Sequence, residues 1–102
     1  MKKYNYNVVL DTELGKRNGT MQLSIDGTEI DGVLSLLNNT EPCHGNIGSD
    51  GYCNLYGKIV TLIKEMFYEA TGYISGNEIV LTLQSGKNTF LMKGIASCKL
   101  GE

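Results

Sequence analysis

The soft metal ligands of this sequence gather in one short stretch. Two of the three cysteines and the single histidine lie between Cys43 and Cys53. Thiolates and imidazoles bind zinc, and two nearby cysteines can form a disulfide. Zinc sites use spaced ligand pairs, whereas Cys43 and His44 are adjacent and would face opposite sides of a strand. We therefore interpret Cys43 and Cys53 as small apolar side chains of a core. The sequence predicts no metal site and no cofactor.

Nucleophilic catalysis requires a nucleophile beside a base. Cys43 and His44 form the only conceivable pair, and their adjacency on a strand separates them. No phosphate-binding loop and no dinucleotide-binding glycine motif is present. We expect no catalytic residues and no enzymatic activity.

Length and charge restrict the class of protein. The 102 residues make one domain, residues 1–102, with a net charge of −2. The charges are scattered singly, so we expect neither nucleic acid nor an anionic membrane surface as a partner. No apolar run suits a secretion signal or a membrane span. The default expectation is a cytoplasmic protein with reduced cysteines.

The chain contains an internal repeat. The stretch "IDGTEI" at 25–30 matches "ISGNEI" at 74–79, and further identities at the same spacing fall on turns and on apolar positions of the same phase. We interpret residues 4–49 and 53–98 as two copies of a four-strand unit. Tight-turn residues separate segments of alternating polarity, so the expected strands are 3–12, 18–26, 28–37, 43–49, 52–62, 66–75, 78–85 and 88–98.

Alternation along these strands predicts one apolar face and one solvent-exposed polar face, called the wet face below. Both copies agree in phase, with Ile30 and Ile79 on the apolar face and Glu29 and Glu78 on the wet face. Short connections between successive strands favour an antiparallel meander. The predicted fold is all-β, an eight-stranded antiparallel up-and-down barrel formed by internal duplication, because closure removes exposed edges.

Residues 57–70 also fit a helix, because their apolar residues recur at helical spacing. The equivalent stretch of the first copy, residues 8–21, contains two glycines and has the pattern of a hairpin. Since two copies of one unit should fold alike, we predict strand, turn and strand over 57–70.

The motifs "GTMQL" at 19–23 and "IDGTEIDG" at 25–32 resemble those of small single-domain bacterial β-barrel proteins of unknown function. In strand count the chain also resembles the meander architecture of lipocalins and streptavidin, although it contains no Trp. This resemblance covers nearly the whole chain. It implies the barrel fold, and its motifs belong to turns and core and imply no catalytic residue.

Glycines recur on the predicted inner face, at positions 32, 45, 57, 72 and 94. Two interpretations remain open: glycines let strongly coiled strands bend, or they leave a hollow for one small ligand. For the second, tyrosines near the ends would add polar contacts to an apolar lining. The predicted ligand-contacting residues are Tyr4, Tyr6, Gly32, Gly57, Tyr68, Phe90 and Met92.

Two functional hypotheses follow. The first is a non-catalytic module that holds a small apolar or amphipathic molecule in the mouth of the barrel. The second is a structural or protein-interaction module with a filled barrel that forms a homo-oligomer. Its basis is an outward cluster of apolar residues on neighbouring strands: Val9, Val33, Phe67, Tyr73, Val80, Leu91 and Ile95.

Overall fold

The computed structural model describes residues 2–12, 15–36, 39–60 and 65–97. Eight strands account for nearly all of them, and no helix occurs within these ranges. The strands are β1 (Lys2–Thr12), β2 (Gly15–Asp26), β3 (Glu29–Leu36), β4 (Asn39–Ile47), β5 (Tyr52–Val60), β6 (Glu65–Ile74), β7 (Glu78–Ser85) and β8 (Asn88–Ala96).

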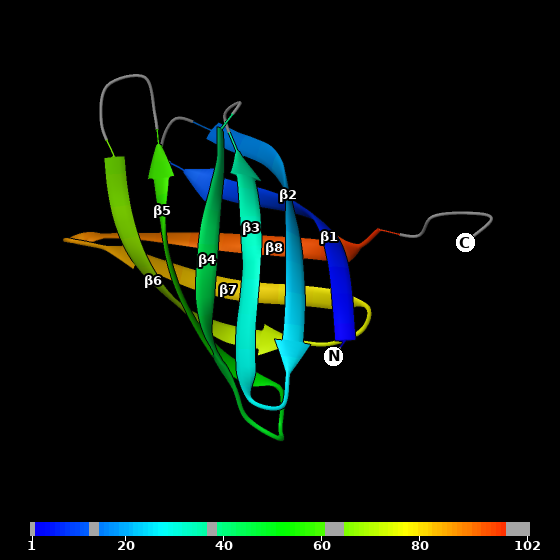
Figure 1. Cartoon of the computed structure of the whole chain (residues 1–102). Coiled ribbons are helices and arrows are strands. Elements are labelled where there is room, and N and C mark those ends of the chain that lie inside the picture. The colour runs from blue at the N-terminus through cyan, green and yellow to red at the C-terminus, as the bar shows by residue number, and fades with distance from the viewer. Residues whose placement is uncertain (1, 13–14, 37–38, 61–64, 98–102) are drawn as a thin grey trace.

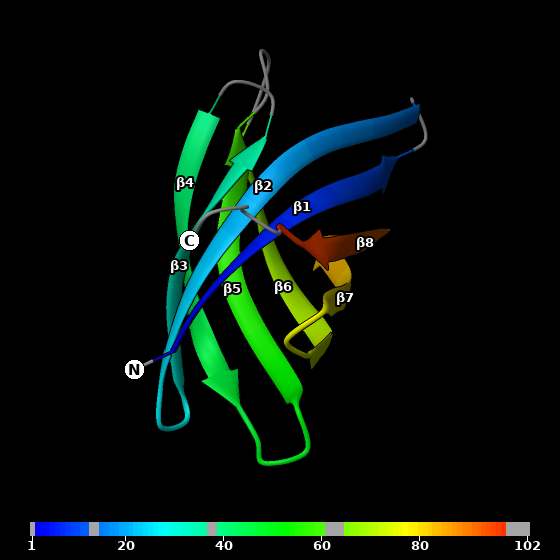
Figure 2. The same ribbon diagram turned by 90° about the vertical axis from the view of Figure 1, so that its right-hand side faces the viewer.

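The strands form a closed barrel in chain order, β1 to β8, and each pairs antiparallel with the next. Pairing of β1 with β8, from Tyr6 with Ala96 to Asp11 with Leu91, closes the cylinder. The barrel is flattened, with principal extents of 36 × 30 × 18 Å. Figure 1 shows β2 to β5 crossing in front of β7 and β8, and Figure 2 shows the same wall from the side. The predicted all-β meander barrel is confirmed.

The predicted apolar face lines the inside of the barrel. Ile30 and Ile79 are buried, as the alternation requires, and the buried side chains of the described residues are aliphatic, methionine, tyrosine or cysteine, with no charged residue among them. The core consists of Tyr6, Val8, Leu10, Met21, Leu23, Ile30, Leu34, Leu36, Cys43, Cys53, Leu55, Ile59, Tyr68, Ala70, Ile74, Ile79, Leu81, Leu83 and Met92.

The inward glycines allow close approach of neighbouring strands. A Cβ atom at Gly45 would lie 1.7 Å from the carbonyl oxygen of Asn54, and one at Gly72 would lie 1.9 Å from that of Val80. Only a residue without a side chain fits against backbone at these distances, and such contacts let strands coil tightly enough to close a small barrel. At Gly45 and Gly72 the place of a side chain is therefore occupied by the neighbouring strand, which favours the first of the two interpretations, that glycines let the strands coil.

The fourth strand begins earlier than predicted and includes Pro42. The sequence placed the start of the fourth strand at Cys43, whereas β4 begins at Asn39 and pairs with β3 up to Leu36. Proline is usually excluded from a ladder because it lacks an N–H donor. Here the carbonyl oxygen of Pro42 approaches Gly57 of β5. In an antiparallel ladder the N–H and C=O of a residue point to the same neighbour, so the missing donor faces β5 and leaves pairing with β3 intact.

Within residues 57–70 the structure contains the end of β5 and the start of β6, not a helix. The two strands pair from Val60 with Glu65 to Tyr52 with Tyr73. The predicted connection was 63–65; the structure already has Glu65 in β6, and residues 61–64 lie outside the described residues. The strand interpretation is thus confirmed where it can be compared, while the internal duplication that suggested it stays a prediction.

Candidate ligand-binding groove

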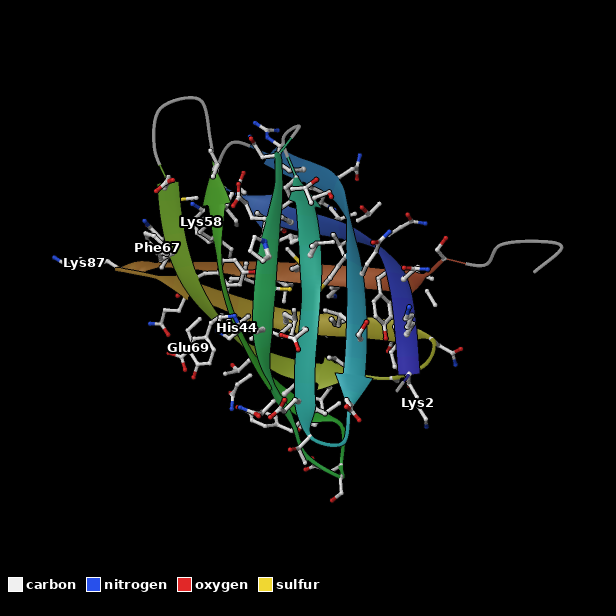
Figure 3. All side chains as sticks on the ribbon, in the orientation of Figure 1. Lys2, His44, Lys58, Phe67, Glu69 and Lys87 are labelled. Carbon is white, nitrogen blue, oxygen red and sulfur yellow. The ribbon has the colours of Figure 1, made fainter. Side chains whose placement is uncertain are left out.

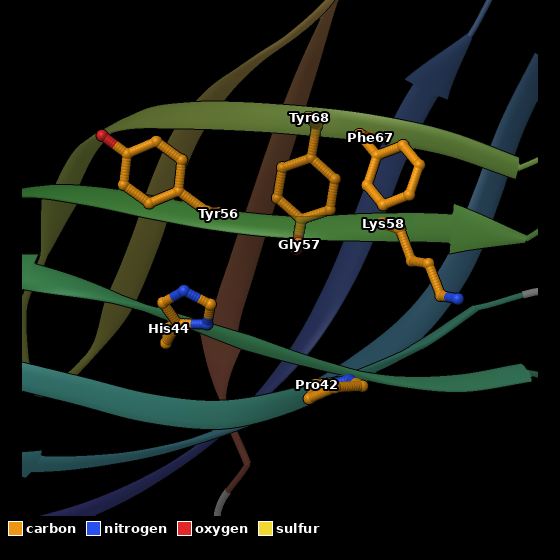
Figure 4. A pocket seen from close by; sticks show the side chains of 7 residues that line it. All are labelled: Pro42, His44, Tyr56, Gly57, Lys58, Phe67 and Tyr68. Atoms are coloured by element: carbon orange, nitrogen blue, oxygen red, sulfur yellow. The ribbon is translucent and has the colours of Figure 1, made fainter.

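The wall of the barrel opens between β4 and β5. Their ladder runs only from Ile47 with Cys53 to Cys43 with Gly57. Beyond that point the strands diverge, as Figure 4 shows between Pro42 and Lys58. Because the nitrogen of Pro42 faces β5 without a hydrogen, this residue cannot extend the ladder. At the far end of the opening, the side-chain amide of Asn39 donates a hydrogen bond of 3.3 Å to the carbonyl of Val60.

A groove of about 440 Å³ lies over this opening on the outer surface of β4, β5 and β6. Its volume is within the range of small-molecule sites. Seven residues line it (Figure 4): Pro42, His44, Tyr56, Gly57, Lys58, Phe67 and Tyr68. A smaller hollow continues along the same opening, where the core residues Leu34, Leu36 and Ile59 contribute to its lining. The volume of this second hollow is only about 10 Å³, so the core beneath the opening is nearly filled.

Tyr68 forms the floor of the groove. It pairs with Gly57 across β5 and β6, and a Cβ atom at Gly57 would lie 2.6 Å from the Tyr68 hydroxyl oxygen. The aromatic ring therefore lies across the glycine and fills the place of its missing side chain, a known way to stabilise glycine in a sheet. Gly57 and Tyr68 thus act as one packing unit.

The hydroxyl group of Tyr68 has no hydrogen-bond partner among the described residues. The side chain is only 5 % exposed. Burial, reinforced by the neighbouring Cys43 thiol, raises the pKa of Tyr68 far above its usual value. The group is therefore a neutral donor at physiological pH. An unsatisfied buried hydroxyl costs on the order of 1–3 kcal/mol, so this donor is a costly feature of the core.

Aromatic rings form the outer part of the groove. The His44 and Tyr56 rings, from β4 and β5, have centroids 6.3 Å apart. Phe67 projects from β6 and is 69 % exposed. Figure 3 shows His44, Lys58 and Phe67 on the same side of the barrel. These side chains give a small molecule flat apolar surfaces to pack against.

Lys58 is the cation at the edge of the groove. Its ammonium donates a 3.2 Å hydrogen bond to Glu65 and lies 3.8 Å from Glu41. The hydrogen bond to Glu65 and the two negative charges raise the pKa of Lys58. Two further carboxylates are close, because Asp31 pairs with His44 and Glu69 pairs with Tyr56 across the strands. Carboxylates therefore outnumber the lysine around the groove.

Of the residues predicted from the sequence, the structure brings only Gly57 and Tyr68 into this groove. Tyr4 and Tyr6 stack with ring centroids 6.2 Å apart, and the Tyr6 hydroxyl donates to the carbonyl of Ser75 in the β6–β7 turn. Phe90 lies near the β7–β8 turn, at the end of the barrel opposite Tyr4 and Tyr6.

The remaining two predicted residues are packed in the wall. Met92 is fully buried between Leu10 and Leu81 of the neighbouring strands. A Cβ atom at Gly32 would lie 2.1 Å from the carbonyl oxygen of Gln22. The seven predicted residues therefore do not form one site, and their contact with a ligand stays a prediction.

Sequence reasoning missed the outer residues of the groove. His44 and Lys58 were predicted only as residues of the solvent-facing side, Pro42 and Tyr56 received no role, and Phe67 was only one member of an apolar cluster. A signal was present, because a proline inside an alternating segment indicates a local gap in a ladder. Which neighbouring strand faces that gap depends on the pairing register, and the register cannot be determined from the sequence.

The two described cysteines are free and buried. Burial raises the pKa of Cys53 to about 11, and burial together with the charge of Asp31 raises that of Cys43 to about 11. Cys43 faces the core while His44 is exposed. Within the described ranges no three His, Cys, Asp or Glu side chains come together as metal ligands.

The fold and groove define a closed eight-stranded meander barrel with an opening in its wall. Among solved structures, the chain is similar to the redesigned β-barrel mFAP1 bound to DFHBI. The TM-score is 0.67 and the identity 13 %, over 92 % of this chain and 93 % of that chain. At this identity the likeness shows the fold alone. No protein-family model and no curated protein matches the chain. In the described residues, no helix has the length and apolar character needed to cross a membrane.

Proposed function

We propose that this barrel is a non-catalytic binding module for a small amphipathic molecule, and that the β4–β6 groove is its site. The observation that carries the proposal is the groove itself, an apolar hollow of about 440 Å³ at a break in the ladder, with a polar hydroxyl at its floor. Ligand sites combine an apolar lining with a few polar groups that fix orientation. This location replaces the barrel mouth that the sequence suggested.

Two observations support a non-catalytic role. The raised pKa values of Cys43 and Cys53 keep both thiols protonated near neutral pH, and a thiol is a poor nucleophile. His44 lies on the opposite face of β4 from Cys43. A barrel of the same fold, mFAP1, was solved bound to DFHBI, which supports binding as a use of this architecture. Kinship with small bacterial or lipocalin-like barrels and a cytoplasmic location remain parts of the proposal.

A pair of matched variants tests the site. Phe67 and Ile95 are both apolar and exposed, 69 % and 71 %, but only Phe67 lines the groove. We expect a panel of small amphipathic molecules, from 1-octanol to 2-naphthol, to yield binders that shift the NMR amide signals of Gly57 and Lys58. Phe67→Lys should weaken that binding severalfold, because a charged chain replaces an aromatic wall, whereas Ile95→Lys should leave it unchanged. Absence of any binder, or unchanged binding to Phe67→Lys, would contradict the proposal.

A second candidate function is self-association. Tyr52, Tyr73 and Val80 pair in succession across β5 to β7, and Ile95 of β8 lies diagonal to Val80, with Lys93 opposite Val80 and Glu78 opposite Ile95. We call Tyr52, Tyr73, Val80 and Ile95 the Tyr52–Ile95 strip. The Tyr52 and Tyr73 rings meet edge to face with centroids 5.3 Å apart. Contiguous exposed apolar residues are typical of interaction surfaces. The strip lies apart from the groove, so the two functions are compatible.

A further inference from the structure

The Tyr68 hydroxyl is a buried polar group without a hydrogen-bond partner among the described residues. Its oxygen would lie 2.6 Å and the ring carbon Cζ 2.9 Å from a Cβ atom built at Gly57, so the oxygen packs over the glycine but makes no hydrogen bond to any described residue. A buried donor without an acceptor destabilises the folded state. A ligand that supplied the acceptor would remove this penalty and gain affinity from it.

The position of the hydroxyl makes this contact reachable from the groove. It lies directly behind Gly57, which has no side chain to cover it; the carbonyl oxygen of Pro42 is also close to this position, 3.1 Å from a Cβ built at Gly57. The ladder between β4 and β5 ends at this level. The hydroxyl oxygen itself is covered, so an acceptor that enters between Pro42 and Lys58 reaches it by moving the ends of β4 and β5 apart.

The charges around the groove restrict the ligand further. Glu41 and Glu65 already neutralise Lys58, and Asp31 and Glu69 add negative charge nearby. An anionic ligand would be repelled, since like charges in a partly desolvated groove raise each other's free energy. The aromatic lining favours a flat ring system over a flexible chain, because rings stack on rings with little loss of conformational entropy.

We infer that the β4–β6 groove binds a flat, uncharged aromatic molecule whose hydrogen-bond acceptor reaches the Tyr68 hydroxyl through the opening between β4 and β5. The inference rests on the proposed function and names the class of its ligand. It assigns three roles: the rings of His44, Tyr56 and Phe67 hold the ligand plane, the hydroxyl of Tyr68 orients it, and the surrounding carboxylates exclude anions.

Quinoline and naphthalene test the inference, because they share a shape and differ in one acceptor nitrogen. Each is titrated near neutral pH into the ¹⁵N-labelled full chain, with the amides of Gly57 and Lys58 as reporters. One net hydrogen bond predicts that quinoline binds about fivefold to tenfold more tightly than naphthalene. Naphthalene-2-carboxylate should bind most weakly. The preference for quinoline should disappear in Tyr68→Phe, whose unfolding free energy should equal or exceed that of the unmodified chain.

A second readout needs no variant. The ¹³Cζ signal of Tyr68 should shift with quinoline and stay in place with naphthalene, because that carbon responds to hydrogen bonding of the attached hydroxyl. Equal affinity for the two probes, or a preference that survives in Tyr68→Phe, would overturn the inference and leave the proposed function intact. If neither probe nor any other amphipathic molecule shifts the groove amides, the proposed function itself fails.

Discussion

Burial changes the acid–base chemistry of Cys43 and Cys53. In the unfolded chain a thiol loses its proton near its ordinary pKa of 9.0, whereas in the barrel both pKa values are about 11. Between these values the folded state holds more protons than the unfolded state. Raising the pH through this window therefore favours unfolding. The stabilising contribution of the buried thiols is complete below pH 9.0 and is lost as the pH approaches about 11.

The resulting prediction concerns stability in alkali. We expect the free energy of unfolding in urea to fall by about 1 kcal/mol per pH unit for each thiol once the pH exceeds 9. The double variant Cys43→Ala, Cys53→Ala removes both groups and should flatten the slope just above pH 9, before tyrosines begin to titrate. A slope that is unchanged in the double variant would show that the thiols are not its cause.

At the scale of single residues, the sequence predicted which side chains turn inward and not which of them meet a ligand. Alternation placed Tyr68 and Gly57 on the inner face correctly. That the Tyr68 ring lies across Gly57 and leaves its hydroxyl without an acceptor depends on the pairing of β5 with β6. Strand pairing is set by the whole sheet, so no local pattern around either residue could reveal it.

Glycines inside strands and glycines in turns differ in whether they tolerate replacement by alanine. Gly72 lies inside β6 against the carbonyl oxygen of Val80, whereas Gly76, in the turn after β6, has open space where a side chain would be and no positive φ. We expect Gly72→Ala to lower the free energy of unfolding by at least about 2 kcal/mol, because backbone must move to admit the methyl group. Gly76→Ala should change it by less than about 0.5 kcal/mol.

Urea unfolding of the two alanine variants checks this prediction, with equal m-values as the sign that both unfold from the same compact state. If Gly72→Ala is as stable as Gly76→Ala, the close approach of β6 and β7 is not a requirement of the fold.

At the scale of elements, the strand number, order and inner face followed from alternation and turn residues. The start of β4 did not: it was predicted at Cys43, whereas the strand begins at Asn39. Pro42 explains the groove, since its missing donor ends the β4–β5 ladder on one side only. A sequence shows that a proline lacks a donor. Only the register shows which neighbour loses the bond.

For the whole molecule, the Tyr52–Ile95 strip predicts association of two or more copies. We expect sedimentation equilibrium to give a mass above the 11.2 kDa of one chain, and the mass to fall to that of the monomer in Ile95→Lys. A lysine at the strip would have to be desolvated in the interface. Phe67→Lys, at an equally exposed position outside the strip, should keep the wild-type mass. A strictly monomeric unmodified chain at high concentration would refute the role of the strip.

Closure of β1 against β8 has a consequence for how the chain acquires its structure. Tyr6 and Ala96 are neighbours in the barrel but come from opposite ends of the described sequence. Contacts of such high sequence separation form late and slowly, because the entropy of closing a long loop is lost before any pairing compensates for it. During synthesis, the sheet cannot close until β8 has left the ribosome, and until then both of its edge strands are unpaired. Bare edges can template pairing with other chains, so this interval is when the nascent protein is most exposed to aggregation.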